Sequence, residues 1–304
     1  MRISSSTFYS SSLGGILNQQ SSISTLNQQI ASGNKLLTAA DDPVAASQVM
    51  SLNDRISLST QYTTNQQSIS QTQSEETTIL NQIQKTLQSA QSALTGVSAS
   101  NDQSTKNAIG ATLSGLYQQI KDLANSQDTN GNYIFSGFQT STQPYDGTSY
   151  NGDNGLRYVQ IAQGQTVQAN DNLNTVLNAG TGTTTGPTFD LLQTMQQTAA
   201  ALQSTTTPVT STQLTNAYTA VTGALSGLQD IQTSLVARQQ QVQSQQTATQ
   251  QLQATNQNAL GNLSQLSDAD KASAIVELQM RQTSLQAAES AFASTSKLSL
   301  FNYL

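Results

Sequence analysis

Side-chain oxygens that could hold a divalent cation occur in two short stretches of the sequence. One stretch is an acidic pair directly before a proline, and the other is the turn-rich segment YDGTSYNGDNG. The oxygen-bearing residues are Asp41, Asp42, Asp146, Asp153 and Asn154. The pair has no further ligand at useful spacing, and the segment lacks the regular spacing and closing Glu of an EF-hand calcium loop. We therefore interpret the acidic pair as a helix cap and the polar residues of the segment as turn-forming residues.

Catalytic side chains are scarce, because the 304 residues include no histidine and no cysteine. This removes the commonest general base and metal ligand, together with thiolate nucleophiles and disulfides. A peptidoglycan hydrolase that uses Asp and Glu stays as an alternative, but it needs two carboxylates that face each other across a cleft. The acidic residues are instead scattered over predicted helices and turns. The sequence predicts a protein that is not an enzyme and holds no metal or cofactor.

The composition limits both the core and the partners. Hydrophobic residues make up 35% of the chain, charged residues 9%, and the formal net charge is -6. Nucleic-acid binding needs clustered Lys and Arg, whereas the 11 basic residues here are scattered. No run approaches the roughly 18 apolar residues of a membrane span, and the N-terminal stretch lacks the apolar core of a secretory signal. We expect a thin core, no nucleic acid, no membrane insertion and no cleaved signal peptide.

Apolar residues at helical spacing predict a helix at each end of the chain. The N-terminal stripe consists of Ile16, Ile23, Leu26 and Ile30. The C-terminal stripe consists of Leu278, Leu285 and Phe292. Both stripes are interrupted by polar residues, and such helices are poorly stable alone. We therefore expect the two ends to pair with each other and with neighbouring subunits, and to become ordered on assembly.

The inner part of the chain predicts further helices around a different kind of segment. Continuous stripes over 43–98, 109–123, 189–199 and 214–235 can satisfy one another as an internal core. Between them, Asn-Gly and Asp-Gly steps separate short runs of Tyr, Ile, Phe and Val, which predicts β-hairpins within 131–186. The stretch NAGTGTTTGPT is typical of a flexible connection. The predicted fold class is mainly α with a small β-rich insertion.

A helix-breaking segment separates the N-terminal helix from the next one. Gly33 and Asn34 tolerate the left-handed conformation at a helix C-terminus, and Asp42-Pro43 is typical of an N-cap followed by proline at the first helical position. We interpret this segment as a joint between domains. The predicted domains are a terminal coiled-coil inner domain (1–42 with 265–304), a helical domain (43–130 with 187–264) and a β-rich outer domain (131–186).

Several stretches resemble the bacterial flagellin family. They are MRISSSTFY at the start, IASGNKLLTAADDPVAAS after the first helix, GNYIFSGFQT at 131–140, and the ending DADKASAIVELQMRQTSLQAAESAFASTSKLSLFNYL. The match to flagellin itself is poorer, because Gly33 is followed by Asn34-Lys35-Leu36 and the usual Arg after a Gly-Lys pair is missing. The SLFNYL ending also differs from that of flagellin. Within the family, the chain is more similar to proteins of the junction between hook and filament.

The resemblance implies a structural axial component of the bacterial flagellum. Such a protein forms the junction between hook and filament and supports flagellin assembly and motility; the alternative is flagellin, the filament subunit. The implied fold is a flagellin-like rod of long helices, formed by pairing the N- and C-terminal segments. The implied partners are further copies of the chain in a junction layer, an adjacent hook-associated protein, flagellin and a flagellar export chaperone. Export through the flagellar type III apparatus would make the protein extracellular.

The resemblance also implies roles for particular residues. Leu298 and Leu300 join the C-terminal stripe as part of the inner helix that contributes to the assembly interface. Gly33, Asp41 and Asp42-Pro43 belong to the inter-domain joint.

Overall fold

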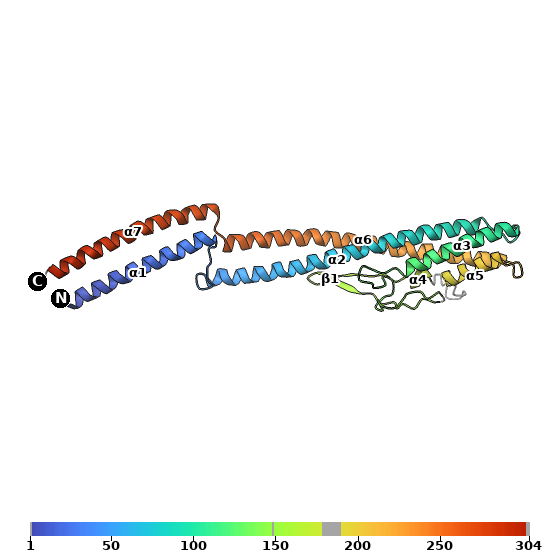
Figure 1. Cartoon of the computed structure of the whole chain (residues 1–304), viewed down its shortest axis with the longest axis horizontal. Helices are drawn as coiled ribbons and strands as arrows, with labels where there is room; N and C mark the ends of the chain where they lie inside the picture. The colour runs from blue at the N-terminus through green and yellow to red at the C-terminus, as the bar shows by residue number, and fades with distance from the viewer. Residues whose placement is uncertain (1, 148, 178–189, 302–304) are drawn as a thin grey trace. The chain divides into compact units, whose positions relative to one another are not determined.

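Long helices dominate the computed structural model of the chain (Figure 1). The structure describes residues 2–147, 149–177 and 190–301. The helices are α1 (Arg2–Ser32), α2 (Pro43–Thr95), α3 (Gln103–Ala124), α4 (Asn174–Leu177), α5 (Leu191–Gln203), α6 (Ser211–Ser264) and α7 (Asp268–Phe301). The strands are β1 (Tyr158–Ala162) and β2 (Gln165–Gln168). The predicted fold class, mainly α with a small β-rich insertion, is confirmed.

The chain forms two compact units. One comprises Met1–Thr60 with Gln251–Leu304, and the other comprises Gln61–Gln250. Both boundaries fall inside helices, because α2 and α6 contribute to each unit. The domain limits predicted from the sequence, at the breaks between helices, stay a prediction.

The larger unit holds the main apolar core. Side chains at three- and four-residue spacing on four helices bury one face of each helix. Among the buried residues are Leu80, Ile83 and Leu87 of α2, Leu113 and Ile120 of α3, Leu192 and Met195 of α5, and Val221 and Leu228 of α6. Each such side chain contributes about 1.5–3 kcal/mol on burial. The prediction that these stripes form an internal core is confirmed.

Close approach of α3 to α5 depends on a glycine. A Cβ at Gly110 would lie 2.9 Å from the carbonyl oxygen of Ala199, so any larger residue would push the two helices apart. Both helices begin at an aspartate cap. Asp102 accepts from the amide of Thr105 at 3.1 Å, and Asp190 accepts from the amide of Gln193 at 2.9 Å.

A polar seam holds α2 against α6 where the apolar stripe of α6 becomes thin. Three glutamines spaced seven residues apart on α6 each donate a side-chain hydrogen bond to a side chain of α2. The pairs are Gln232 with Asn81 (3.1 Å), Gln239 with Thr77 (2.9 Å) and Gln246 with Ser70 (3.1 Å). A hydrogen bond of this kind contributes about 0.5–1.5 kcal/mol net. The seam therefore keeps the helices paired with little apolar surface.

The described part of the β-rich segment contains one hairpin, which lies within the range predicted from the sequence. β1 and β2 are antiparallel, with Val159 opposite Val167, and the chain turns at Gly164, which has φ 71°. The Asn-Gly and Asp-Gly steps instead close local turns that carry only isolated bridges, Gln127 to Tyr133 and Tyr145 to Tyr150. Turn chemistry alone did not specify which runs would pair as strands. The Gly/Thr-rich segment 178–188 and Phe189 lie outside the described residues.

The hairpin packs on the helices through a second, small apolar cluster. Ile161 and Val167 from the strands are buried together with Ile69 of α2 and Val242 of α6. Alternate residues of a strand point to the same face, so the hairpin can cover the helices with one side and expose the other. The cluster fixes the hairpin against the polar part of the α2–α6 pair.

Candidate assembly interface

The two ends of the chain form an antiparallel helix pair. α1 and α7 lie side by side (Figure 1). Near the termini, the ring of Tyr9 lies 4.8 Å from the ring of Phe292, centroid to centroid. Further along, the side-chain amide of Gln19 donates to the carbonyl oxygen of Arg281 at 3.3 Å. The ends of the chain therefore contact each other within one molecule, as the sequence predicted.

The predicted interface residues fall on the inner seam of this pair. Those with described side chains are half-buried: Ile16, Ile23, Leu26 and Ile30 on α1, and Leu278, Leu285 and Phe292 on α7. Because Leu278 and Leu285 stand fourteen and seven residues before Phe292, they share the helix face that meets α1. Leu298 and Leu300 belong to α7, but their side chains lie outside the described part of the chain. Contact of the seam with neighbouring subunits stays a prediction.

At the end of the α1–α7 pair away from the chain termini, two connecting segments are hydrogen-bonded to each other. One connects α1 to α2, and the other connects α6 to α7. The carbonyl oxygen of Gly33 accepts from the amide of Leu266 at 2.8 Å, and the amide of Lys35 donates to Ser264 at 2.8 Å. Gly33 has φ 73°, which confirms the predicted left-handed conformation. Lys35 also forms a 2.9 Å ion pair with Asp270 at the start of α7. These contacts therefore hold the C-terminal end of α1 against the connection between α6 and α7.

Both members of the acidic pair accept backbone hydrogen bonds, and Asp42 caps the next helix. Asp42 accepts from the amides of Val44 (3.0 Å) and Ala45 (2.9 Å), with Pro43 as the first residue of α2. Asp41 accepts from the amides of Thr38 (2.8 Å) and Leu37 (2.9 Å). These backbone donors lower the pKa of Asp41 below its usual value. The predicted cap is confirmed.

The turn-rich segment likewise uses its oxygens internally. Asp146 accepts from the amide of Ser149 at 3.0 Å, and Asp153 accepts from the amides of Phe138 (2.8 Å) and Gly155 (2.7 Å). The side chain of Asn154 accepts from Asn174 at 2.9 Å. These bonds are those of turns. Among the described residues, no three acidic side chains gather where they could hold a metal ion.

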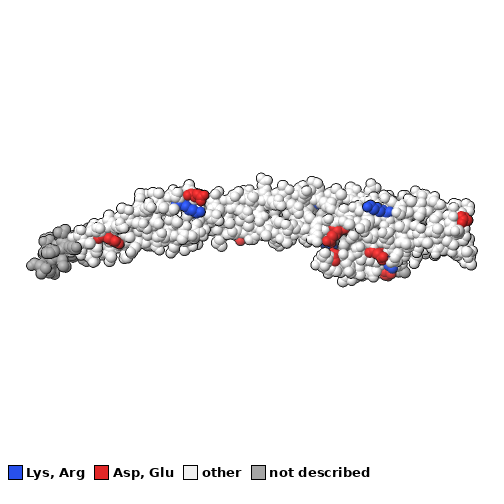
Figure 2. Space-filling model, turned by 45° about the horizontal axis from the view of Figure 1, so that its top comes forward, with Lys and Arg blue, Asp and Glu red and all other residues white. Residues whose placement is uncertain are grey.

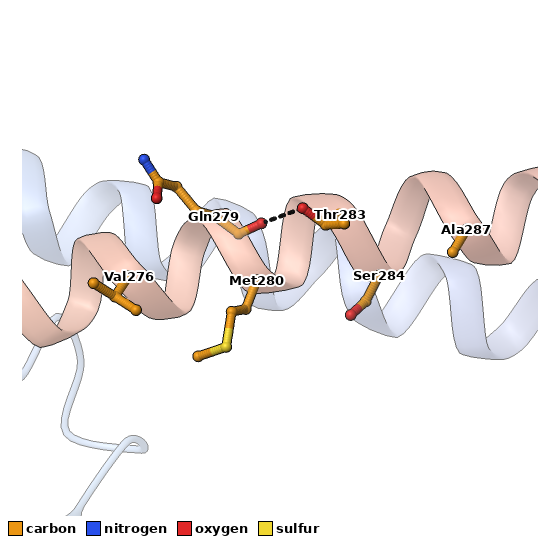
Figure 3. Close-up of a pocket in the computed structure, with 6 residues that line it drawn as sticks. All are labelled: Val276, Gln279, Met280, Thr283, Ser284 and Ala287. Atoms are coloured by element: carbon orange, nitrogen blue, oxygen red, sulfur yellow. Dashed lines mark hydrogen bonds between the residues drawn. The ribbon is translucent and has the colours of Figure 1, made fainter.

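The outer face of α7 carries a groove that the sequence reasoning missed. It has a volume of about 490 Å³ and is lined by Val276, Gln279, Met280, Thr283, Ser284 and Ala287. Figure 3 shows Val276 and Met280 projecting to the same side of the helix. Their exposed fractions are 54% and 60%. The four-residue spacing of these apolar residues, out of phase with the inner stripe, was the signal that could have revealed this second face.

Figure 2 shows few charged side chains on this face of the molecule, some of them as adjacent groups of opposite sign. A neutral polar surface offers little long-range steering toward nucleic acid or acidic surfaces. None of the helices in the described ranges is long and apolar enough to cross a membrane.

A buried ionic cluster in the larger unit was also missed. Arg238 of α6 forms an ion pair with Asp171, and the amide of Asp171 donates to the carboxylate of Glu76 on α2 at 3.0 Å. Burial, reinforced by the negative charge of Asp171, raises the pKa of Glu76 to about 8, although Arg238 opposes the rise. Glu76 interrupts an apolar stripe between Ile69 and Leu80, which was the available signal. The cluster joins the segment after the hairpin to both long helices.

Comparison with known proteins finds a matching family model and similar curated proteins. The bacterial flagellin N-terminal helical region matches residues 3–140. The flagellar hook-associated protein 3 of Salmonella typhimurium is 33% identical over 150 residues, which is 48% of this chain and 46% of that protein. The match thus spans about half the length of the curated relative. The resemblance expected from the sequence motifs is confirmed.

Solved structures show the same fold. A putative flagellar hook-associated protein from Vibrio parahaemolyticus aligns with a TM-score of 0.67 at 20% identity, covering 74% of this chain and 100% of that chain. The flagellar junction protein FlgL from Legionella pneumophila aligns with a TM-score of 0.57 at 18% identity, covering 71% of this chain and 100% of that chain. At this level of identity the likeness establishes the fold.

Proposed function

We propose that this chain is a structural, non-catalytic subunit of the bacterial flagellum that forms the junction between hook and filament. The observation that carries the proposal is the 33% identity over 150 residues with a flagellar hook-associated protein 3. The fold shared with a flagellar junction protein supports it. The subunit would form a homo-oligomeric layer between an adjacent hook-associated protein and the first flagellin subunits.

The geometry of the terminal pair supports an assembling protein. The inner seam is only half-buried, and apolar side chains remain exposed on the outer faces of both helices. A single chain gains little free energy from such surfaces, whereas a layer of neighbours gains it at every subunit. The protein would reach the flagellum unfolded, through the type III apparatus, after binding an export chaperone in the cytosol.

Flagellin is the second candidate, because the matching family model describes a flagellin N-terminal region. The curated relatives bear the name of a hook-associated protein, which favours the junction. Purified protein separates the two candidates. A flagellin should polymerise into long filaments by itself, whereas a junction subunit should not.

Deletion of the gene tests the proposal in cells. Loss of the junction should leave hooks without filaments, release unpolymerised flagellin into the medium and abolish swimming, and the wild-type gene on a plasmid should restore all three. Normal filaments on the deletion strain would refute the junction role.

A further inference from the structure

The groove on the outer face of α7 has the shape of a helix-packing site. Its lining consists of two neighbouring rows at four-residue spacing: Val276, Met280 and Ser284, and Gln279, Thr283 and Ala287. Helices pack by placing a ridge of one at four-residue spacing into the groove between two such rows of another, at a crossing angle of about -50°. The matching occupant is therefore a helix that presents an apolar ridge of that spacing.

Such a ridge occurs on the outer face of α1. Leu13 and Leu17 are four residues apart and are exposed by 43% and 55%. Beside them, a Cβ built at Gly14 or Gly15 would meet no atom within 4 Å other than the neighbouring residues and nearby backbone of its own helix. These small neighbours leave the α1 backbone accessible, so that another helix could approach it closely. The ridge is free in the single molecule.

The ridge and the groove are both uncharged. None of the groove residues is ionisable, and α1 has no ionisable side chain between Arg2 and Lys35 apart from Tyr9. At the edge of the groove, Glu277 and Arg281 are paired with each other at 2.7 Å. A strongly charged partner would therefore find no complement in the groove, whereas the neutral ridge of α1 can enter without burying a charge.

Ridge and groove lie at the same level of the helix pair. Gln19, just beyond the ridge, contacts the carbonyl oxygen of Arg281, within the groove segment. A second copy placed beside the first at equal height would therefore bring its ridge opposite the groove. Because ridge and groove are different surfaces, this contact is heterologous and can repeat from copy to copy around a ring or helix.

We propose that the Leu13–Leu17 ridge of one copy packs into the Val276–Ala287 groove of the next copy within an assembled layer. The inference rests on the proposed function, because it assigns the lateral contact of the junction layer. It also separates two surfaces of α7: the inner seam of Leu278 and Leu285 meets α1 of the same chain, and the outer groove meets α1 of a neighbour.

The absence of cysteine allows a direct cross-linking test, since any introduced thiol is unique. Leu17→Cys and Met280→Cys are introduced into separate full-length chains and co-produced in cells that lack the native gene. Isolated hook–filament structures are treated with a short bismaleimide. The mixture should give a cross-linked dimer, and each variant alone should not. A second pair, Ser21→Cys with Ser284→Cys, repeats the test with substitutions that hardly change the size of the side chains.

The matched control replaces Met280→Cys with Gln282→Cys, an exposed position that lies about 160° around the helix from Met280 and does not line the groove. It should give no dimer with Leu17→Cys. If the cells swim and neither test pair gives a dimer, the inference is overturned and the junction role is unaffected. A dimer formed by the Met280→Cys chain alone would overturn the inference in the same way. Failure of the wild-type chain itself to restore hook-bound filaments would instead refute the proposed function.

A photoreactive side chain identifies any other occupant of the groove. Met280→p-benzoylphenylalanine is irradiated in the same structures, and the captured peptide is sequenced by mass spectrometry. A peptide that contains Leu13 and Leu17 from a second copy supports the inference. A peptide from flagellin or from any other protein overturns it.

Discussion

The ring of Tyr9 lies against the ring of Phe292, with centroids 4.8 Å apart and planes tilted by 49°. This contact joins the two ends of the chain inside one molecule. An aromatic pair of this kind contributes about 0.5–1.5 kcal/mol beyond its burial. It is therefore a useful place to test how firmly α1 and α7 are paired before assembly.

We expect Phe292→Ala to speed amide hydrogen exchange along α1 of the isolated chain by at least about 2–10-fold, since the loss of the ring contact alone shifts the opening equilibrium by that factor and the lost burial adds to it. Exchange in α3, which belongs to the buried core, should not change. Met280→Ala on the outer face of α7 is the control and should leave α1 unaffected. Equal exchange in wild type and Phe292→Ala would show that the seam does not hold the ends together.

The backbone conformation of Gly33 predicts that substitution at this position lowers stability. Gly33 has φ 73°, and a Cβ there would meet no atom within 4 Å. Gly33→Val should therefore destabilise through conformation alone, by about 1–2 kcal/mol. Gly33→Asn, which tolerates this region, should cost less. Thermal unfolding of the two variants provides the measurement, and equal melting temperatures would contradict the account.

Local features of this joint could be predicted from sequence because their causes are local. A positive φ at Gly33 and a cap at Asp42 followed by Pro43 depend on the residues themselves and their immediate neighbours. The internal core was also predictable, since the helix segments that form it, such as α2 from Leu80 to Leu94, repeat apolar residues at three- and four-residue spacing.

Features that depend on partners distant in the chain were not predictable in the same way. The apolar residues of α7 form two stripes, one through Leu278 and one through Met280, and periodicity does not say which of them meets α1. The buried role of Glu76 depends on Asp171 and Arg238, which come from other segments. The hairpin at Gly164 lies within the predicted β-rich region, but the sequence did not single out its two strands, because turn-forming dipeptides are common in the whole segment.

The buried cluster predicts a pH dependence of stability. The pKa of Glu76 is about 8 in the folded chain, above its value of about 4.3 in an unfolded chain. The folded state thus binds a proton more tightly, so the contribution of Glu76 to stability is fully present below the unfolded pKa, is lost as pH rises between the two pKa values, and changes no further above the folded one. Thermal unfolding between pH 5 and 9 should show this fall as a decreasing melting temperature.

Replacement of the titrating group isolates its contribution. Glu76→Gln keeps the shape but cannot ionise, so the decrease between pH 5 and 9 should become clearly shallower. Glu75→Gln is a neighbouring control that should leave the decrease unchanged. A wild-type melting temperature that rises over this pH range would contradict the assignment.

The inner seam predicts an assembly defect from one substitution. Leu285→Asp would place a carboxylate in the half-buried contact between α7 and α1, where an unpaired charge is costly. We expect the variant to be exported, because export threads an unfolded chain, but not retained at the hook tip. The variant and unpolymerised flagellin should both appear in the culture medium, and swimming should be lost.

Gln286→Asp adds the same charge at an exposed neighbouring position and should preserve swimming. Normal filaments on cells that carry only Leu285→Asp would show that the seam is not needed for the junction.

The location of the protein tests the central claim most directly. Immunogold labelling of intact flagella with an antibody against this chain should give a single band between hook and filament. Label distributed along the whole filament would identify the chain as flagellin, and the absence of label at the hook–filament boundary would contradict the junction role.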